Sequence, residues 1–116
     1  MNTKRVILEM GSGTDLHGGD YTKASIRAVK DAIYHSSLTM IKTLGLDPVT
    51  DMYVDVTIGV QQPEQVNVNT IKEQLPYGIV TVDVVKGGLD IGDDTSNDFS
   101  VIASAAIIVR LKIPPN

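Results

Sequence analysis

The residues best suited to chemistry lie in one stretch of ten, Gly11 to Asp20, which holds four glycines, two aspartates and one histidine. Asp15 and His17 are two positions apart, so in an extended chain their side chains can point to the same side. An aspartate that orients a histidine produces a general base that works near neutral pH. We therefore expect Asp15 and His17 to be the catalytic pair of an active site.

The same stretch is also suited to binding an anion. Its glycines let backbone N–H groups turn toward a ligand, and the N-terminus of a following helix adds positive potential. On this hypothesis the ligand-binding residues are Gly11, Gly13, Gly18, Asp20 and Lys23. The alternative is structural: Asp15 and Asp20 cap turns, and His17 bonds to the backbone.

Metal and cofactor sites are weaker hypotheses. Glu9 with Asp15 and His17 contains enough ligands for a divalent metal, but strand alternation turns Glu9 to another face. Four later acids lack the spacing of an EF-hand and are typical of a solvated loop: Asp90, Asp93, Asp94 and Asp98. The glycines do not match a dinucleotide fingerprint. We predict no metal and no cofactor, and we expect His35 to be a surface or boundary residue.

Composition excludes several classes of protein. The 116 residues carry a formal net charge of -4 and only 4% aromatic residues, which argues against a nucleic-acid partner. The absence of cysteine rules out disulfides and zinc–thiolate sites. Because no apolar run is long enough for a signal peptide or a membrane span, we expect one cytoplasmic domain, residues 1–116, with no membrane partner.

Hydrophobic periodicity predicts four strands and two helices. The strands are expected at 5–10, 52–60, 79–85 and 99–113, and the helices at 21–36 and 68–75. Asp20 and Asn67 are the expected N-caps, and Pro76 is the expected stop of the second helix. Residues 86–98 are expected to form a loop.

This order, β-α-β-α-β-β, predicts an α+β fold with a mixed four-stranded sheet. The first three strands are parallel, and the last, which is apolar almost throughout, returns antiparallel between the first and second. The strand order is then 1-4-2-3, and both helices cover one face. The residues of the other face are expected to be Arg5, Ile7, Glu9, Tyr53, Asp55, Ile79, Asp83, Val85, Ile108, Arg110 and Lys112.

That uncovered face is too apolar for solvent and too charged for a core, so we expect it to be a subunit interface. Arg110 and Lys112 should pair with acids among Glu9, Asp55 and Asp83. The layout resembles the fold of the trimeric α/β chorismate mutases and of related small trimeric deaminase-like proteins. This resemblance implies a homotrimer, or a multiple of one, with ligand sites between subunits.

The motif Gly11-Ser12-Gly13-Thr14-Asp15-Leu16-His17-Gly18 resembles the Gly-x-Gly-x-Asp-x-His-Gly signature of a small conserved-hypothetical family. The similarity continues at 22–24, 63–66, 75–78 and 87–88. This family has no established activity. The sequence thus predicts an uncharacterised homo-oligomer that binds or acts on a small anionic metabolite at the Gly11–Asp20 loop. The alternative is a non-catalytic oligomeric interaction module.

Overall fold

The computed structural model describes residues 3–34, 51–75, 78–93 and 95–112. The predicted helix end at Ser36, and the predictions for His35, Pro76 and Asp94, lie outside these ranges. The elements, in chain order, are β1 (Thr3–Asp15), α1 (Tyr21–Tyr34), β2 (Met52–Val60), a short 3-10 turn (Pro63–Gln65), α3 (Val68–Lys72), β3 (Ile79–Lys86), β4 (Leu89–Gly92) and β5 (Phe99–Lys112).

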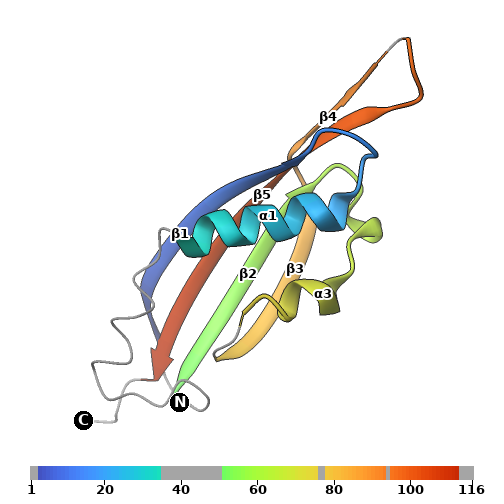
Figure 1. Cartoon of the computed structure of the whole chain (residues 1–116). Coiled ribbons are helices and arrows are strands. Elements are labelled where there is room, and N and C mark those ends of the chain that lie inside the picture. The colour runs from blue at the N-terminus through green and yellow to red at the C-terminus, as the bar shows by residue number, and fades with distance from the viewer. Residues whose placement is uncertain (1–2, 35–50, 76–77, 94, 113–116) are drawn as a thin grey trace.

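The sheet has the order β1-β5-β2-β3, with β4 paired to β5 beyond this path (Figure 1). The predicted α+β class and the order of the four predicted strands are confirmed. β5 runs antiparallel to β1 and β2, and β2 runs parallel to β3. The number of strands was wrong, because β4 forms where a loop was expected. Leu89 and Ile91 share a side of β4, a short alternation hidden among glycines and aspartates.

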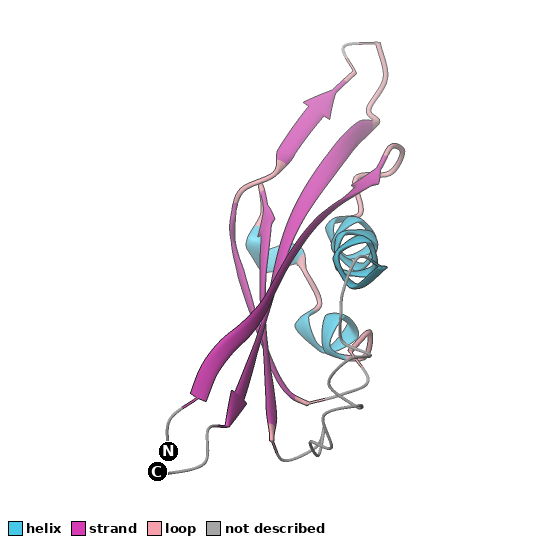
Figure 2. Ribbon diagram, turned by 90° about the vertical axis from the view of Figure 1, so that its left-hand side faces the viewer, coloured by secondary structure: helices cyan, strands magenta, loops and turns pink. Residues whose placement is uncertain are grey.

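Both helices lie on one side of the sheet, as predicted (Figure 2). Their N-caps are also as predicted, since Asp20 Oδ1 accepts the Lys23 N–H at 3.0 Å and Asn67 Oδ1 accepts the Thr70 N–H at 3.2 Å. The core between helices and sheet consists mainly of small and β-branched side chains, among them Ala24, Ala28, Val29, Val54, Val56, Ile58, Ile71, Val101, Ala105 and Val109.

β1 is longer than predicted and continues through the first half of the glycine-rich stretch. A Cβ atom on Gly13 would stand 2.3 Å from the carbonyl oxygen of Ala24, and one on Gly11 would stand 2.5 Å from the amide nitrogen of Ala32. These glycines therefore let the backbone of α1 approach the strand directly. The expectation that Gly11 and Gly13 belong to a loop was wrong.

The face assignment of β1 was also wrong. Ile7 and Glu9 lie on the side that faces the helices, opposite Val109 and Ile107 of β5, whereas Leu8 and Met10 lie on the uncovered face. The cause is a register shift between Arg5 and Ile7, a β-bulge that adds one residue and reverses the alternation beyond it. Large apolar side chains exposed on the uncovered face are Val6, Leu8, Met10, Ile79, Val85, Leu89 and Ile91.

At one end of the uncovered face, Arg110 pairs with Asp55, as predicted, with Nε 2.7 Å from Oδ2. This pairing holds the pKa of the Asp55 carboxyl below its usual range. The Lys112 Nζ atom lies over the ring of Tyr53, 5.9 Å from its centroid. Arg110 and Lys112 are thus held by cross-strand contacts within the chain.

The molecule is elongated, with extents of 62 × 23 × 18 Å and a Cα radius of gyration of 15.9 Å. A compact domain of this length has a radius of gyration of about 13 Å. The extra length comes largely from the β4–β5 hairpin, which projects past the ends of β1 and β2 (Figure 1). In the described part of the chain, none of the helices has the length and apolar character needed to cross a membrane.

Candidate functional site

The loop after β1 meets the β4–β5 hairpin where its two strands join the turn, and a pocket of about 160 Å³ lies between them. Its position follows from strand pairing, because β1 ends at Asp15, opposite Val101, while β5 begins two residues earlier at Phe99. The residues just after β1 therefore face the first residues of β5. The lining residues are Leu16, His17, Ile91, Gly92, Asp93, Asp98, Phe99 and Ser100.

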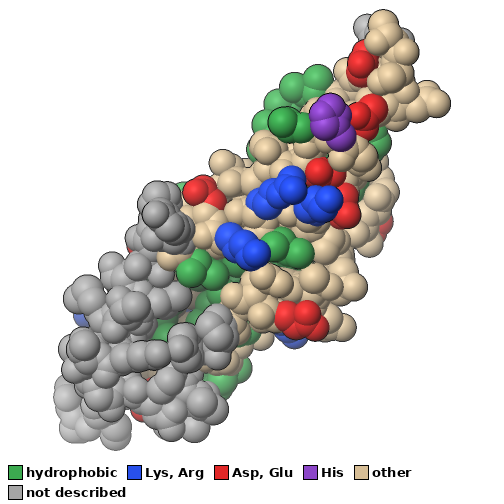
Figure 3. All heavy atoms as spheres, in the orientation of Figure 1, with side chains coloured by type: hydrophobic (Ala, Val, Ile, Leu, Met, Phe, Trp, Pro, Cys, Tyr) green, Lys and Arg blue, Asp and Glu red, His purple; other side chains and the backbone are tan. Residues whose placement is uncertain are grey.

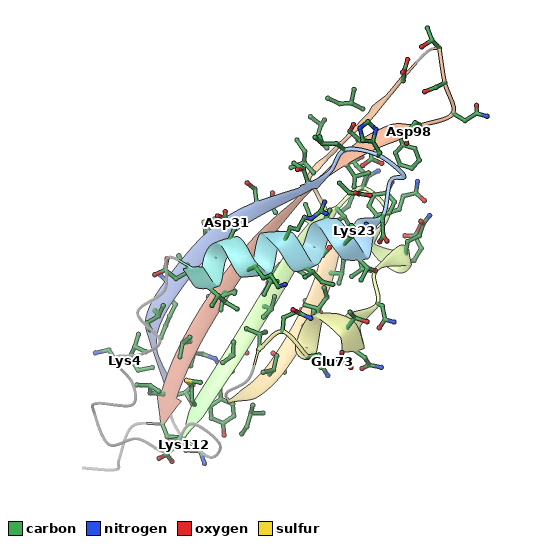
Figure 4. All side chains as sticks on the ribbon, viewed as in Figure 1. Lys4, Lys23, Asp31, Glu73, Asp98 and Lys112 are labelled. Atoms are coloured by element: carbon green, nitrogen blue, oxygen red, sulfur yellow. The ribbon has the colours of Figure 1, made fainter. Side chains whose placement is uncertain are left out.

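His17 is fixed by a bond across this junction. Its Nδ1 lies 2.9 Å from Oδ2 of Asp98, while 88% of the His17 side chain is exposed. An ionised carboxylate only accepts hydrogen bonds, so Nδ1 is the donor and Nε2 is free to accept or, when the ring is protonated, to donate. Figure 3 shows the histidine next to acidic side chains near the hairpin, and Figure 4 labels Asp98 there.

Asp98 is held in turn by backbone donors. Its Oδ1 accepts the Gly18 N–H at 2.7 Å and the Phe99 N–H at 3.1 Å. The Gly18 bond first, and His17 second, keep the pKa of the Asp98 carboxyl below its ordinary value. Ser100 completes the junction, because its hydroxyl donates to the Leu16 carbonyl at 2.8 Å. The orientation of the imidazole is thus set by a carboxylate that is itself fixed in place.

Asp15, the expected partner of His17, lies on the helix side of the sheet and is only 5% exposed. Its Oδ2 accepts the Asp20 N–H at 2.9 Å, and its Oδ1 lies 3.5 Å from Nη1 of Arg27. Asp15 and His17 therefore do not form the expected pair. Asp15 connects the loop to α1, and Asp98 orients His17. The catalytic role expected of Asp15 stays a prediction.

Two backbone donors of the loop already hold the chain's own carboxylates. The N–H of Gly18 serves Asp98, and the N–H of Asp20 serves Asp15. Gly18 and Gly19 have φ values of 92° and 60°, which favour glycine. A Cβ on Gly19 would also stand 2.3 Å from the ring of Phe99. The anion-binding geometry expected of this loop is thus used at least partly within the molecule.

The structure brings none of the five predicted ligand-binding residues into the lining of the pocket. Gly11 and Gly13 lie beneath α1, Asp20 caps that helix, and Lys23 is exposed in its first turn (Figure 4). Blue side chains in Figure 3 continue along α1 from that turn. Of the residues proposed from the sequence, only His17 lines the pocket. The proposed roles of the others stay predictions.

Asp98, Phe99 and Ser100 were missed as site residues. Asp98 was interpreted as one acid among several in a solvated loop. The signal that could have found it was the predicted pairing of the first and last strands, since a register that places Asp15 opposite Val101 also brings His17 near residues 98–100. The composition of the loop alone does not predict how β1 pairs with β5.

A second polar pair lies deeper, beside the pocket. The hydroxyl of Tyr21 donates to Oδ2 of Asp90, and the ring of Tyr21 lies 6.4 Å from that of Phe99. Burial, followed by the Asp90 carboxyl, raises the pKa of Tyr21 from 10.0 to about 12. Oδ1 of Asp90 is buried and has no hydrogen-bond partner among the described residues. Within the same residues, no group of three or more His, Asp or Glu side chains is arranged to hold a metal ion.

Two comparisons with known proteins found a match. The chain is similar to an FtsZ-like protein of unknown function from Nostoc punctiforme, known from its crystal structure, with 35% sequence identity and a TM-score of 0.82 over 97% of this chain and 99% of that one. A comparison with curated proteins found no match. The resemblance to chorismate mutases stays a prediction. The model of a family described as "conserved hypothetical protein (Lin0512_fam)" matches residues 5–109, and the chain belongs to this family.

Proposed function

We propose that the protein binds a small molecule in the His17 pocket and that His17 holds the ligand or exchanges a proton with it. The observation that carries this proposal is the His17–Asp98 bond at the pocket, 2.9 Å between Nδ1 and Oδ2. It fixes the ring while leaving Nε2 exposed, which is the arrangement that a general acid or base requires.

The pocket suits a small ligand with an apolar part. Leu16, Ile91 and Phe99 provide apolar surface, and His17 and Ser100 provide polar groups. Its volume of about 160 Å³ is close to that of protein cavities that hold a benzene molecule. A compact metabolite fits these dimensions better than a nucleotide or a peptide does.

The test is a ligand screen read at His17 itself. Small aliphatic and aromatic carboxylates, with their amides and amines, are added to protein labelled for NMR of histidine side chains. A ligand of the pocket should move the His17 ring signals, which are identified by their absence from the spectrum of His17→Gln. It should also raise the Tm of the native protein, by an amount that grows with ligand concentration, but not that of His17→Gln. Unmoved His17 signals across the panel would contradict the proposal.

A second candidate function is assembly, favoured by the uncovered sheet face. Its seven large apolar side chains are between 43% and 66% exposed. An apolar surface of this kind on a soluble chain usually marks an interface, here between copies of this chain. We propose a homo-oligomer on this ground; the trimer expected from the resemblance stays a prediction.

Light scattering tests the assembly. The double variant Leu8→Lys and Ile79→Lys should lower the mass to that of a monomer, because it buries two unpaired charges in the interface. Asn69→Lys, which adds one lysine on the exposed side of α3, is the control and should keep the native mass. A native protein that is monomeric at micromolar concentration would contradict the assembly.

A further inference from the structure

The charges of the uncovered face are divided between its two ends. β5 runs the whole length of the face, and Arg110 and Lys112 lie at its last residues, with Arg5 opposite Arg110. Strand alternation continues from Ile91 and Ser100 to Asp93 and Asp98, which places these two acids at the other end, beside the pocket. Figure 4 labels Lys112 and Asp98 at opposite ends of the molecule. One end of the face is therefore basic and the other is acidic.

The pocket contains no lysine or arginine from the described part of its own chain. Its charged groups are the carboxylates of Asp93 and Asp98 and the imidazole of His17. β5 spans 14 residues, which at about 3.3 Å per residue separates Lys112 from the pocket by about 40 Å. The cations of the basic end can reach a pocket only if that pocket belongs to another copy.

The sheet edge at β1 is obstructed, whereas the uncovered face is open to association. The bulge between Arg5 and Ile7 interrupts the strand, and the outward N–H of Ser12 donates to Oδ2 of Asp31 at 3.0 Å. Bulges and side chains that occupy edge donors discourage strand pairing between chains. The apolar side chains, by contrast, lie on the open face.

We infer that two copies pack their uncovered faces together with their strands in opposite directions, and that Arg5 of each copy completes the His17 pocket of the other. Strands in the same direction would put cations over cations, whereas opposite directions put each basic end over an acidic end, twice by symmetry. When the two faces overlap over their full length, Arg5 and Arg110 of one copy lie over the first residues of β5 in the other copy.

This inference rests on the proposed pocket and assigns its ligand class. Arg110 is already bonded to Asp55 and Thr3, so the exposed Arg5 is the guanidinium available to a ligand. A guanidinium matches a carboxylate by two parallel hydrogen bonds. The ligand is therefore a small carboxylate with an apolar group, held between His17 of one copy and Arg5 of the other.

Subunit complementation tests this composite site, with benzoate as the probe and benzamide as its uncharged control. His17→Gln and Arg5→Glu should each weaken benzoate binding at least about tenfold. Both residues are exposed, so both variants are expected to fold. When the two variants are co-expressed in equal amounts, half of the pairs are mixed and each has one intact site, so about one quarter of the native sites should return.

A distance measurement tests the direction of packing without any ligand. Spin labels on Lys112→Cys should lie about 40 Å apart in opposed copies, but less than about 20 Å apart in copies with parallel strands. If the native protein binds benzoate and the mixed variants recover no sites, the composite site is refuted and the pocket stands. If benzoate does not bind, the ligand proposal fails while a label distance of about 40 Å still supports the packing. A shorter distance, or a monomer, overturns it.

Discussion

At the scale of single residues, the site depends on one carboxylate with three donors. Asp98 accepts bonds from Gly18, His17 and Phe99. These bonds join the loop after β1 to the start of β5. His17 is therefore held in its position only while the Asp98 carboxyl is ionised.

The first prediction concerns the pH at which this junction loosens. The Gly18 and His17 bonds hold the pKa of Asp98 below its ordinary 3.8. A depressed folded pKa means that the bonds stabilise the fold above the unfolded pKa and that this stabilisation is lost as the pH falls through the folded pKa. The Gly18 amide signal should therefore titrate with a midpoint below 3.8 in NMR spectra of the native protein.

Asp98→Asn removes that titration and is its control. A midpoint at or above the ordinary value would show that Gly18 and His17 do not stabilise the carboxylate in solution.

The second prediction separates the two acids of the pocket. Asp98→Asn should weaken the binding of a pocket ligand about tenfold, because an amide orients the imidazole less firmly and does not stabilise its charged form. Asp93→Asn should have a smaller effect, since the Asp93 carboxylate bonds to Thr95 and Ser96 instead. Calorimetric titration of both variants measures the difference. Equal losses would assign the effect to net charge rather than to His17.

The sequence could identify His17 by its type and setting, but not its partner. Asp98 is 81 positions away, and only the register of β1 on β5 brings the two together. Asp15, two positions from His17, was the local choice, and it is turned away because alternation places it on the helix side of β1. Short-range spacing therefore predicted the place of the site better than its contacts.

At the scale of elements, the contact between β1 and α1 is made by backbone. Gly11 and Gly13 leave no side chain between strand and helix. The position of α1 is consequently set by the strand beneath it, and the loop that carries His17 connects the two.

The third prediction is that Gly13→Ala destabilises the fold by about 1–3 kcal/mol, since its methyl group would enter the backbone of α1. Gly92→Ala is the matched control, because a Cβ at that position meets no atom within 4 Å. Urea unfolding of the two variants gives the comparison. Similar free energies of unfolding would refute the close packing of α1 on β1.

The fourth prediction concerns Tyr21, which attaches α1 to β4 through Asp90. Tyr21→Phe should cost about 1–3 kcal/mol at neutral pH, because it leaves a half-buried carboxylate without its donor. The folded pKa of Tyr21, about 12 against 10.0, is raised, so its stabilisation is present below pH 10 and is lost as the pH rises through 12.

Denaturant unfolding at a series of alkaline pH values checks this dependence. The native protein should lose more stability than Tyr21→Phe between pH values of about 9 and 12. Parallel curves for the two proteins would mean that Tyr21 ionises equally easily in the folded and unfolded states.

The sequence predicted most elements because their alternation is regular. β2 has the predicted bounds, β3 ends one residue later than predicted, and β5 begins at the predicted residue. β4 was missed because four residues are too few for a periodic signal. The bulge in β1 was missed because an extra residue there leaves no mark in a run of apolar side chains.

At the scale of the whole molecule, the topology followed from one property of the sequence. β5 is apolar on both sides, and only a central strand accounts for that. The shape did not follow, because nothing in a glycine- and aspartate-rich segment predicts that it will extend the sheet as a hairpin.

The fifth prediction uses that shape. If copies pack face to face, the longest dimension of the assembly should stay close to the 62 Å of one chain, while its cross-section grows. End-to-end association would instead give about twice that length. Small-angle X-ray scattering measures this dimension directly. The monomeric Leu8→Lys and Ile79→Lys variant gives the single-chain reference.

The bulge in β1 makes Val6 easy to substitute and hard to delete. Val6 is the extra residue between two paired positions and is 46% exposed in the single chain, so other apolar side chains would be accepted there. Deleting Val6 would make the hydrogen-bond ladder between β1 and β5 continuous. The residues on one side of the deletion would then turn to the opposite face of the sheet. Either Thr3 and Arg5 turn to the helix side and Thr3 loses its bond to Arg110, or Gly11 and Gly13 turn outward and side chains collide with α1. A survey of natural or engineered variants should therefore find Val6 variable in identity and invariant in number.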